Sequence, residues 1–92
     1  MTTNDITVNN APSPELIAEC ESWPVWESEA RKFDWYYTET EMVLIIEGEV
    51  TIKNLDGTGA VTLKKGDYAE LPCGLECQWD IQKPFKKHYN FK

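Results

Sequence analysis

Basic residues, long apolar segments and cysteines are all few in this sequence, and each shortage excludes a class of protein. Basic residues are few, with nine Lys and Arg against 16 Asp and Glu in 92 residues, so the net charge is −7. This balance excludes non-specific binding to nucleic acids or anionic membranes, which needs a basic surface. Long apolar runs are also missing, because the longest uninterrupted one, 42–46, is far too short to span a membrane.

Cysteine is scarce and odd in number. Cys20, Cys73 and Cys77 suit a reducing compartment better than a disulfide scaffold. Residues 1–5 contain no basic side chain and no apolar stretch follows them, so we expect no secretory signal peptide. The sequence therefore predicts a cytoplasmic protein.

What the chain does contain is a series of short segments in which apolar and polar residues alternate. Alternation with Gly and Pro turns every 8–12 residues or so is typical of an antiparallel β-sandwich or barrel. The sequence therefore predicts an all-β fold of one domain over residues 1–92, with its core at about 33–91. The expected strands are 6–8, 33–37, 41–47, 49–53, 60–64, 68–71, 76–81 and 85–91.

The first 32 residues are expected to pack on this barrel as a short strand, a short helix and a Trp-rich segment. Ser13 precedes Pro14 and Glu15, which is a typical helix start with Ser as the N-cap and Pro in the first turn. We therefore predict a helix over about residues 14–20 and no other.

Two spaced motifs point to a family. Gly66, Pro72 and Gly74 form the pattern G-(x)5-P-x-G, and Glu41 with Gly48 forms E-(x)6-G. Together they resemble the two conserved motifs of the cupin superfamily, over residues 33–81. The resemblance implies a single jelly-roll β-barrel, in which two antiparallel sheets close on each other.

Three further segments carry a narrower resemblance. Residues 22–26 (SWPVW), 33–37 (FDWYY) and 87–89 (KHY) are similar to small single-domain cupins related to the ureidoglycine aminohydrolase cupin domain of bacteria and plants. This resemblance implies a homodimer in the cytoplasm, or in the plastid stroma if the source is a plant.

The metal ligands of the superfamily are largely absent. Metal-binding cupins carry H-x-H three or four residues before the first-motif Glu, and a further His after the last Gly of the second motif. The corresponding positions hold Trp35 and Tyr37, or Asp34 and Tyr36, and then Cys77. Because all three imidazoles are lost, we expect no metal cofactor. Glu41 and Cys77 are the two remaining candidate ligands.

Strand alternation indicates which side chains face the barrel interior. The predicted ligand-binding set is Trp35, Tyr37, Glu41, Cys77, Trp79 and Lys87. A carboxylate among aromatic rings must be paired or hydrogen-bonded, because unpaired burial is costly. We therefore hypothesise that Glu41 meets Lys87, Tyr37 or both, while His88 faces outward.

Cys77 has three interpretations at this point. It is a small buried hydrophobe, a thiolate nucleophile or soft metal ligand beside Lys87, or a redox-sensitive group.

Three functions remain open. The first is a metal-free barrel that binds a small molecule in an aromatic and carboxylate pocket. The second is a hydrolase or isomerase acting on a small metabolite, with Glu41 as acid or base and Lys87 beside it. The third is a structural or regulatory dimer, which predicts a filled interior and an exposed apolar patch.

Overall fold

The seven strands within residues 6–92 form one antiparallel sheet, and its two longest strands run through the middle of it. The computed structural model describes residues 6–92, so the segment considered for a signal peptide, residues 1–5, lies outside the described residues. The elements in chain order are β1 (Thr7–Asn9), α1 (Pro14–Cys20), β2 (Val25–Ser28), β3 (Arg31–Tyr36), β4 (Glu41–Asn54), β5 (Ala60–Lys64), β6 (Tyr68–Leu71) and β7 (Glu76–Phe91).

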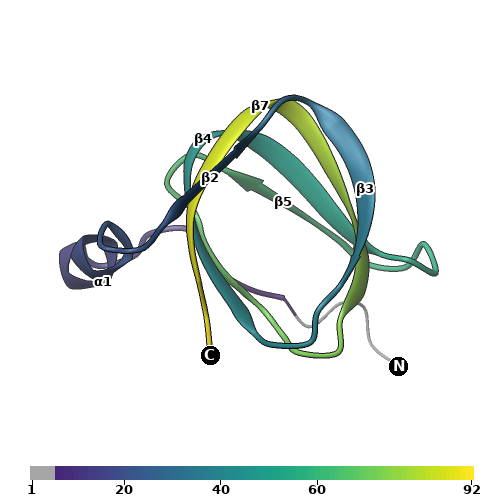
Figure 1. Cartoon of the computed structure of the whole chain (residues 1–92), viewed down its shortest axis with the longest axis horizontal. Helices are drawn as coiled ribbons and strands as arrows, with labels where there is room; N and C mark the ends of the chain where they lie inside the picture. The colour runs from purple at the N-terminus through teal and green to yellow at the C-terminus, as the bar shows by residue number, and fades with distance from the viewer. Residues whose placement is uncertain (1–5) are drawn as a thin grey trace.

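β4 and β7 are antiparallel neighbours, and each changes partner along its length. The first part of β4 pairs with β6, and its second part pairs with β5. The first part of β7 pairs with β3, and its last part pairs with β2. The strands thereby curl into the closed outline seen in Figure 1. The all-β jelly-roll prediction is confirmed, although 41–47 with 49–53, and 76–81 with 85–91, each form one continuous strand.

Gly48 permits the bend in β4. Its φ is +89°, a conformation that side chains other than Gly adopt only at a cost. A Cβ at this position would lie 2.4 Å from the carbonyl oxygen of Pro84 in β7. The register between β4 and β7 shifts on both sides of Glu47, which marks a β-bulge. The bulge turns Glu47 to the outside, where it is exposed.

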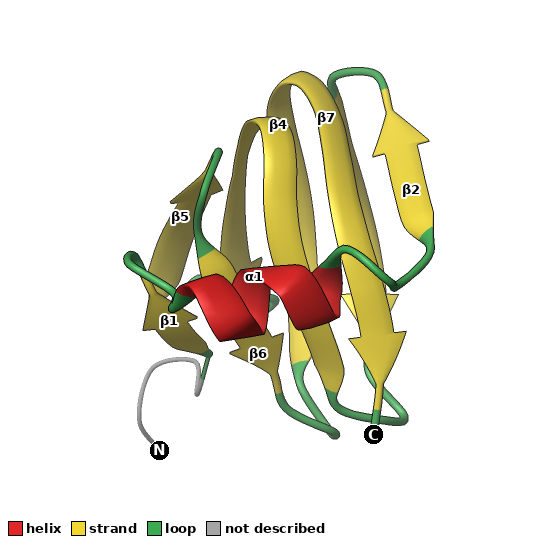
Figure 2. Ribbon diagram, turned by 90° about the vertical axis from the view of Figure 1, so that its left-hand side faces the viewer, coloured by secondary structure: helices red, strands yellow, loops and turns green. Residues whose placement is uncertain are grey.

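The helix lies on the outer face of the barrel (Figure 2). Its predicted bounds and cap are confirmed, because the Ser13 hydroxyl accepts a hydrogen bond from Leu16 N at 3.2 Å. Cys20 packs there against Leu44 of β4 and Tyr68 of β6, forming a small second apolar cluster. No helix within residues 6–92 is long and apolar enough to cross a membrane.

One strand was not predicted. β2 pairs with the last part of β7, so that Trp26 lies opposite Lys87. The segment is only four residues long and is followed by charged residues, so its alternation was too brief to detect. Pairing with β7 points Trp26 toward Trp79 and Phe85, whose ring centroids lie 6.4 and 6.3 Å away.

Candidate functional site

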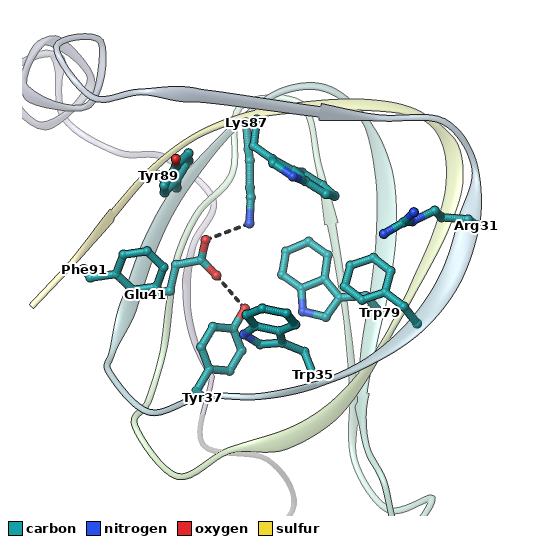
Figure 3. A pocket seen from close by; sticks show the side chains of 10 residues that line it. Arg31, Trp35, Tyr37, Glu41, Trp79, Lys87, Tyr89 and Phe91 are labelled. Atoms are coloured by element: carbon teal, nitrogen blue, oxygen red, sulfur yellow. Dashed lines mark hydrogen bonds and ion pairs between the residues drawn. The ribbon is translucent and has the colours of Figure 1, made fainter.

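The barrel encloses a cavity of about 370 Å³ that opens to solvent. A cavity of this size falls in the range of small-molecule sites, roughly 300–1,000 Å³. Figure 3 shows its walls, which come from β2, β3, β4 and β7 and from the turn after β3. The lining residues are Trp26, Arg31, Phe33, Trp35, Tyr37, Glu41, Trp79, Lys87, Tyr89 and Phe91.

A hydrogen-bonded chain of three side chains lies in this cavity (Figure 3). Lys87 Nζ donates to Glu41 Oε2 at 2.7 Å, and Tyr37 Oη donates to Glu41 Oε1 at 2.5 Å. Glu41 and Lys87 expose only 4% and 6% of their surface. The hypothesis that Glu41 meets Lys87, Tyr37 or both is therefore confirmed, and both contacts are present. Each carboxylate oxygen already accepts one hydrogen bond, which offsets the cost of burying the charge.

The Lys87 ammonium lies inside an aromatic cage. Its Nζ is 4.3 Å from the centroid of the Trp79 ring, 5.1 Å from that of Trp26 and 5.9 Å from that of Tyr89. Ring faces attract cations at such distances. Burial lowers the pKa of Lys87, and the charge and hydrogen bond of Glu41 act in the opposite direction.

Tyr37 serves as a neutral donor at the other end of the chain. Burial is the largest cause that raises the pKa of its phenol, and the neighbouring Glu41 carboxylate raises it further. The hydroxyl therefore keeps its proton at neutral pH and goes on donating to Glu41. The Trp35 ring packs edge-on against Tyr37 with centroids 6.4 Å apart.

The remaining wall is a packed aromatic layer. Phe33 of β3 stacks on Trp79 of β7 with an interplanar angle of 14° and centroids 6.0 Å apart. Trp79 is 2% exposed. Its indole Nε1 has no hydrogen-bond partner among the described residues.

Cys77 does not line the cavity, although the sequence placed it in the ligand-binding set. It is fully buried in the main core, and its thiol donates to the Trp35 carbonyl oxygen at 3.6 Å. Burial raises the pKa of Cys77 to about 11, so the thiol is protonated at neutral pH. A protonated, buried thiol is a poor nucleophile and a poor metal ligand, which leaves the interpretation as a small hydrophobe best supported.

Strand alternation brings the other predicted residues together but missed part of the lining. Trp35, Tyr37, Glu41, Trp79 and Lys87 all face the cavity. Five lining residues lie outside the predicted set. The same alternation turns three of them, Phe33, Tyr89 and Phe91, to the interior face, and extending it along β3 reaches Arg31. Trp26 gave no signal because β2 was not recognised. His88 faces away from the cavity, as predicted, with Nδ1 3.0 Å from the Trp23 carbonyl oxygen.

The residues present do not fit the metal site of the superfamily. Within residues 6–92, no three His, Cys, Asp or Glu side chains gather closely enough to hold a metal ion. Glu41 is the one superfamily ligand that remains, and both its oxygens are bound by Tyr37 and Lys87. The Lys87 ammonium already supplies a positive charge beside this carboxylate, and it would repel a metal cation.

Solved structures share this fold. A DUF861-family protein (tm1112) from Thermotoga maritima is 38% identical over 96% of this chain and 100% of its own, with a TM-score of 0.89. The EutQ protein of Clostridium difficile is 21% identical over 94% of this chain and 66% of its own, with a TM-score of 0.66. A putative ethanolamine utilization protein Q from Salmonella typhimurium is 14% identical over 94% and 68%, with a TM-score of 0.65.

The sequence comparisons assign the family. No curated protein matches the chain. The family model described as the EutQ-like cupin domain matches residues 18–89, which include all the lining residues except Phe91. With this match, and with the close structural similarity to the Thermotoga maritima protein, the chain belongs to the EutQ-like cupin domain family.

Proposed function

We propose that this protein binds a small organic molecule in the barrel cavity and does so without a metal ion. The observation that carries the proposal is the open cavity of about 370 Å³ around the Tyr37–Glu41–Lys87 chain. A barrel that served only as a structural core would have this volume filled by side chains, because protein interiors are close-packed.

The polar chain supports binding more than catalysis by a free base. A general base needs a lone pair available to a substrate proton. Each oxygen of Glu41 already uses one of its two lone pairs to accept a hydrogen bond, from Tyr37 or from Lys87, and the two donors hold the carboxylate in place. The arrangement holds the three side chains in fixed positions, which is what a site needs in order to orient a ligand with few polar contacts.

A hydrolase or isomerase is the second candidate. It is favoured by the resemblance to ureidoglycine aminohydrolase cupins and by a carboxylate with two proton donors, Tyr37 and Lys87, at one cavity wall. A ligand that breaks the Lys87–Glu41 bond on entry would free Glu41 as an acid or base. In that case, a compound that binds should be converted by the wild type and left unchanged by Glu41→Gln.

Trp35 and Tyr36 provide a matched pair for testing the binding proposal. Both are exposed aromatic residues of β3, at 51% and 57%, and neighbours on a strand point to opposite faces. Only Trp35 lines the cavity. Removing either ring should change stability little, but only Trp35→Ala removes a wall of the site.

The experiment is a thermal-shift screen of small planar metabolites. We expect some compounds to raise Tm of the wild type and of Tyr36→Ala, and to lose this effect with Trp35→Ala. If no compound raises Tm, or if Trp35→Ala responds like Tyr36→Ala, the cavity is not the binding site.

A further inference from the structure

The side chains that line the cavity have a positive net charge, although the net charge of the whole protein is strongly negative. Arg31 and Lys87 contribute two positive charges against the single negative charge of Glu41, so the lining sums to +1. The whole chain has a net charge of −7. The cavity is therefore a local exception to the acidic surface, and a monoanion is the ligand that would neutralise it.

Arg31 is the charge in the cavity that is left without a counterion. Among the described residues this exposed side chain forms no ion pair, whereas Lys87, the other cation of the lining, is paired with Glu41. Figure 3 shows its side chain reaching from β3 toward the barrel interior. Its guanidinium carbon lies 4.8 Å from the centroid of the Phe33 ring. Stacking on Phe33 holds the planar group in place while its N–H donors remain free.

The two cations of the cavity also carry more open donors than Glu41 carries open acceptor sites. Lys87 has three N–H donors, and one of them donates to Glu41. Each Glu41 oxygen already accepts one hydrogen bond and keeps a single further lone pair, whereas the Arg31 guanidinium has five N–H donors. A ligand that brings acceptors meets more open partners in this cavity than one that brings donors.

The aromatic walls define the rest of the ligand. Trp35, Tyr89 and Phe91 offer ring faces and edges to a flat apolar body. Such a cage could also attract an ammonium ligand. Here the Lys87 ammonium already occupies it, 4.3 Å from the Trp79 centroid, and would repel a second cation together with Arg31.

We propose that the cavity binds a small organic anion with a flat apolar body, typified by an aromatic carboxylate, and that its carboxylate pairs with Arg31. The planar guanidinium forms two parallel hydrogen bonds with a carboxylate, which a neutral or cationic group cannot reproduce. The flat body then lies among the aromatic rings, next to the fixed Tyr37–Glu41–Lys87 chain. This inference rests on the binding function proposed above and specifies its ligand class.

Three probes of similar shape and different charge test the inference. Benzoate, benzamide and benzylammonium are titrated by calorimetry into the wild type, Arg31→Gln and Lys32→Gln. Lys32 is the adjacent exposed cation of β3 and does not line the cavity, so its substitution controls for the change in net charge. We expect benzoate to bind at least tenfold more tightly than the other two probes. Arg31→Gln should weaken benzoate binding at least tenfold, and Lys32→Gln should change the affinity for benzoate less than twofold.

The other outcomes separate the two proposals. If benzamide or benzylammonium binds as tightly as benzoate, the anion inference is wrong and the binding function stands. Benzoate binding that survives Arg31→Gln likewise overturns the assigned role of Arg31. If none of the three probes binds, the anion inference is again overturned, while the wider screen with the Trp35→Ala and Tyr36→Ala pair still decides the binding function.

Discussion

Lys87 Nζ and Glu41 Oε2 lie 2.7 Å apart, although the two residues are separated by 46 positions in the sequence. They belong to β7 and β4, and their side chains expose only 8% and 5% of their surface. The pair links the two long strands at the cavity wall, and both ends of it are buried. Its contribution to the free energy of unfolding should therefore differ from that of the surface ion pairs between the same strands.

The first prediction concerns this buried pair. Lys87→Met leaves the Glu41 carboxylate without its cation, and removing one partner of a buried pair costs about 3–5 kcal/mol of the free energy of unfolding. Urea denaturation of Glu41→Gln, Lys87→Met and the double variant should show strong coupling. The Lys86–Glu47 pair, 3.3 Å apart but with side chains 35% and 60% exposed, is the matched control and should give about 0–1 kcal/mol. Coupling near zero for Glu41 and Lys87 would show that the pair has no energetic role.

The second prediction concerns the bend at Gly48. Gly48→Ala places a Cβ 2.4 Å from the Pro84 carbonyl oxygen, whereas the same substitution at Gly66 meets nothing within 4 Å. Both positions have positive φ, +89° and +93°, so both lose about 1–2 kcal/mol to backbone strain. Steric overlap should destabilise Gly48→Ala by about 1–3 kcal/mol more. Equal midpoints in urea for the two variants would contradict the assigned crossing of β4 and β7.

Thiol reactivity supplies the third prediction. Cys73 is exposed, while Cys20 and Cys77 are buried. Burial raises the pKa of both buried thiols, that of Cys77 to about 11. At neutral pH, Ellman's reagent should modify one thiol of the native protein quickly, and Cys73→Ala should abolish this fast phase. All three should react in denaturant. Fast native labelling of Cys77 would restore its interpretation as a reactive nucleophile.

The fourth prediction is a loss of stability at alkaline pH. The pKa of Cys77 is raised from an ordinary value of 9.0, so between about pH 9 and 11 the unfolded chain releases a proton that the folded chain retains. Stability contributed by this group is complete below pH 9 and falls as pH rises. Tyr68, whose pKa is raised by burial and by its hydrogen bond to Glu70, acts in the same direction. Lys87, whose pKa is lowered, acts in the opposite direction.

Variants at the two cysteines isolate the contribution of Cys77. Urea stability of the wild type, Cys77→Ala and Cys73→Ala should be measured from pH 8 to pH 11. We expect a shallower fall for Cys77→Ala, whatever its stability at pH 8, and an unchanged fall for Cys73→Ala. Parallel curves for the wild type and Cys77→Ala would contradict the raised pKa.

Strand alternation was enough to predict the fold and the central contact of the site. It placed Glu41, Tyr37 and Lys87 in one interior, and the cost of burying a charge then required them to meet. It could not predict the bulge at Gly48, because the close approach to Pro84 depends on how β4 and β7 cross. The homodimer that the family resemblance implies stays a prediction.

Trp26 is the lining residue that local alternation could not reach. Trp26 faces the cavity only because β2 pairs with β7, and the paired residues lie about 60 positions apart in the sequence. Cys77 shows the converse error. Alternation correctly turned it inward, but it lies in the packed core and outside the cavity lining. Period alone cannot distinguish the wall of a cavity from the core behind it.

Binding of small organic anions in the barrel cavity can be tested by a benzoate titration followed by the indole N–H signals of the ¹⁵N-labelled protein. Of the four Trp residues, Trp26, Trp35 and Trp79 line the cavity, and Trp23 lies in the outer cluster beside the helix. We predict saturable shifts of the three cavity signals and a fixed signal for Trp23. If the cavity signals stay fixed at saturating benzoate, or if Trp23 alone moves, the barrel does not bind small organic anions.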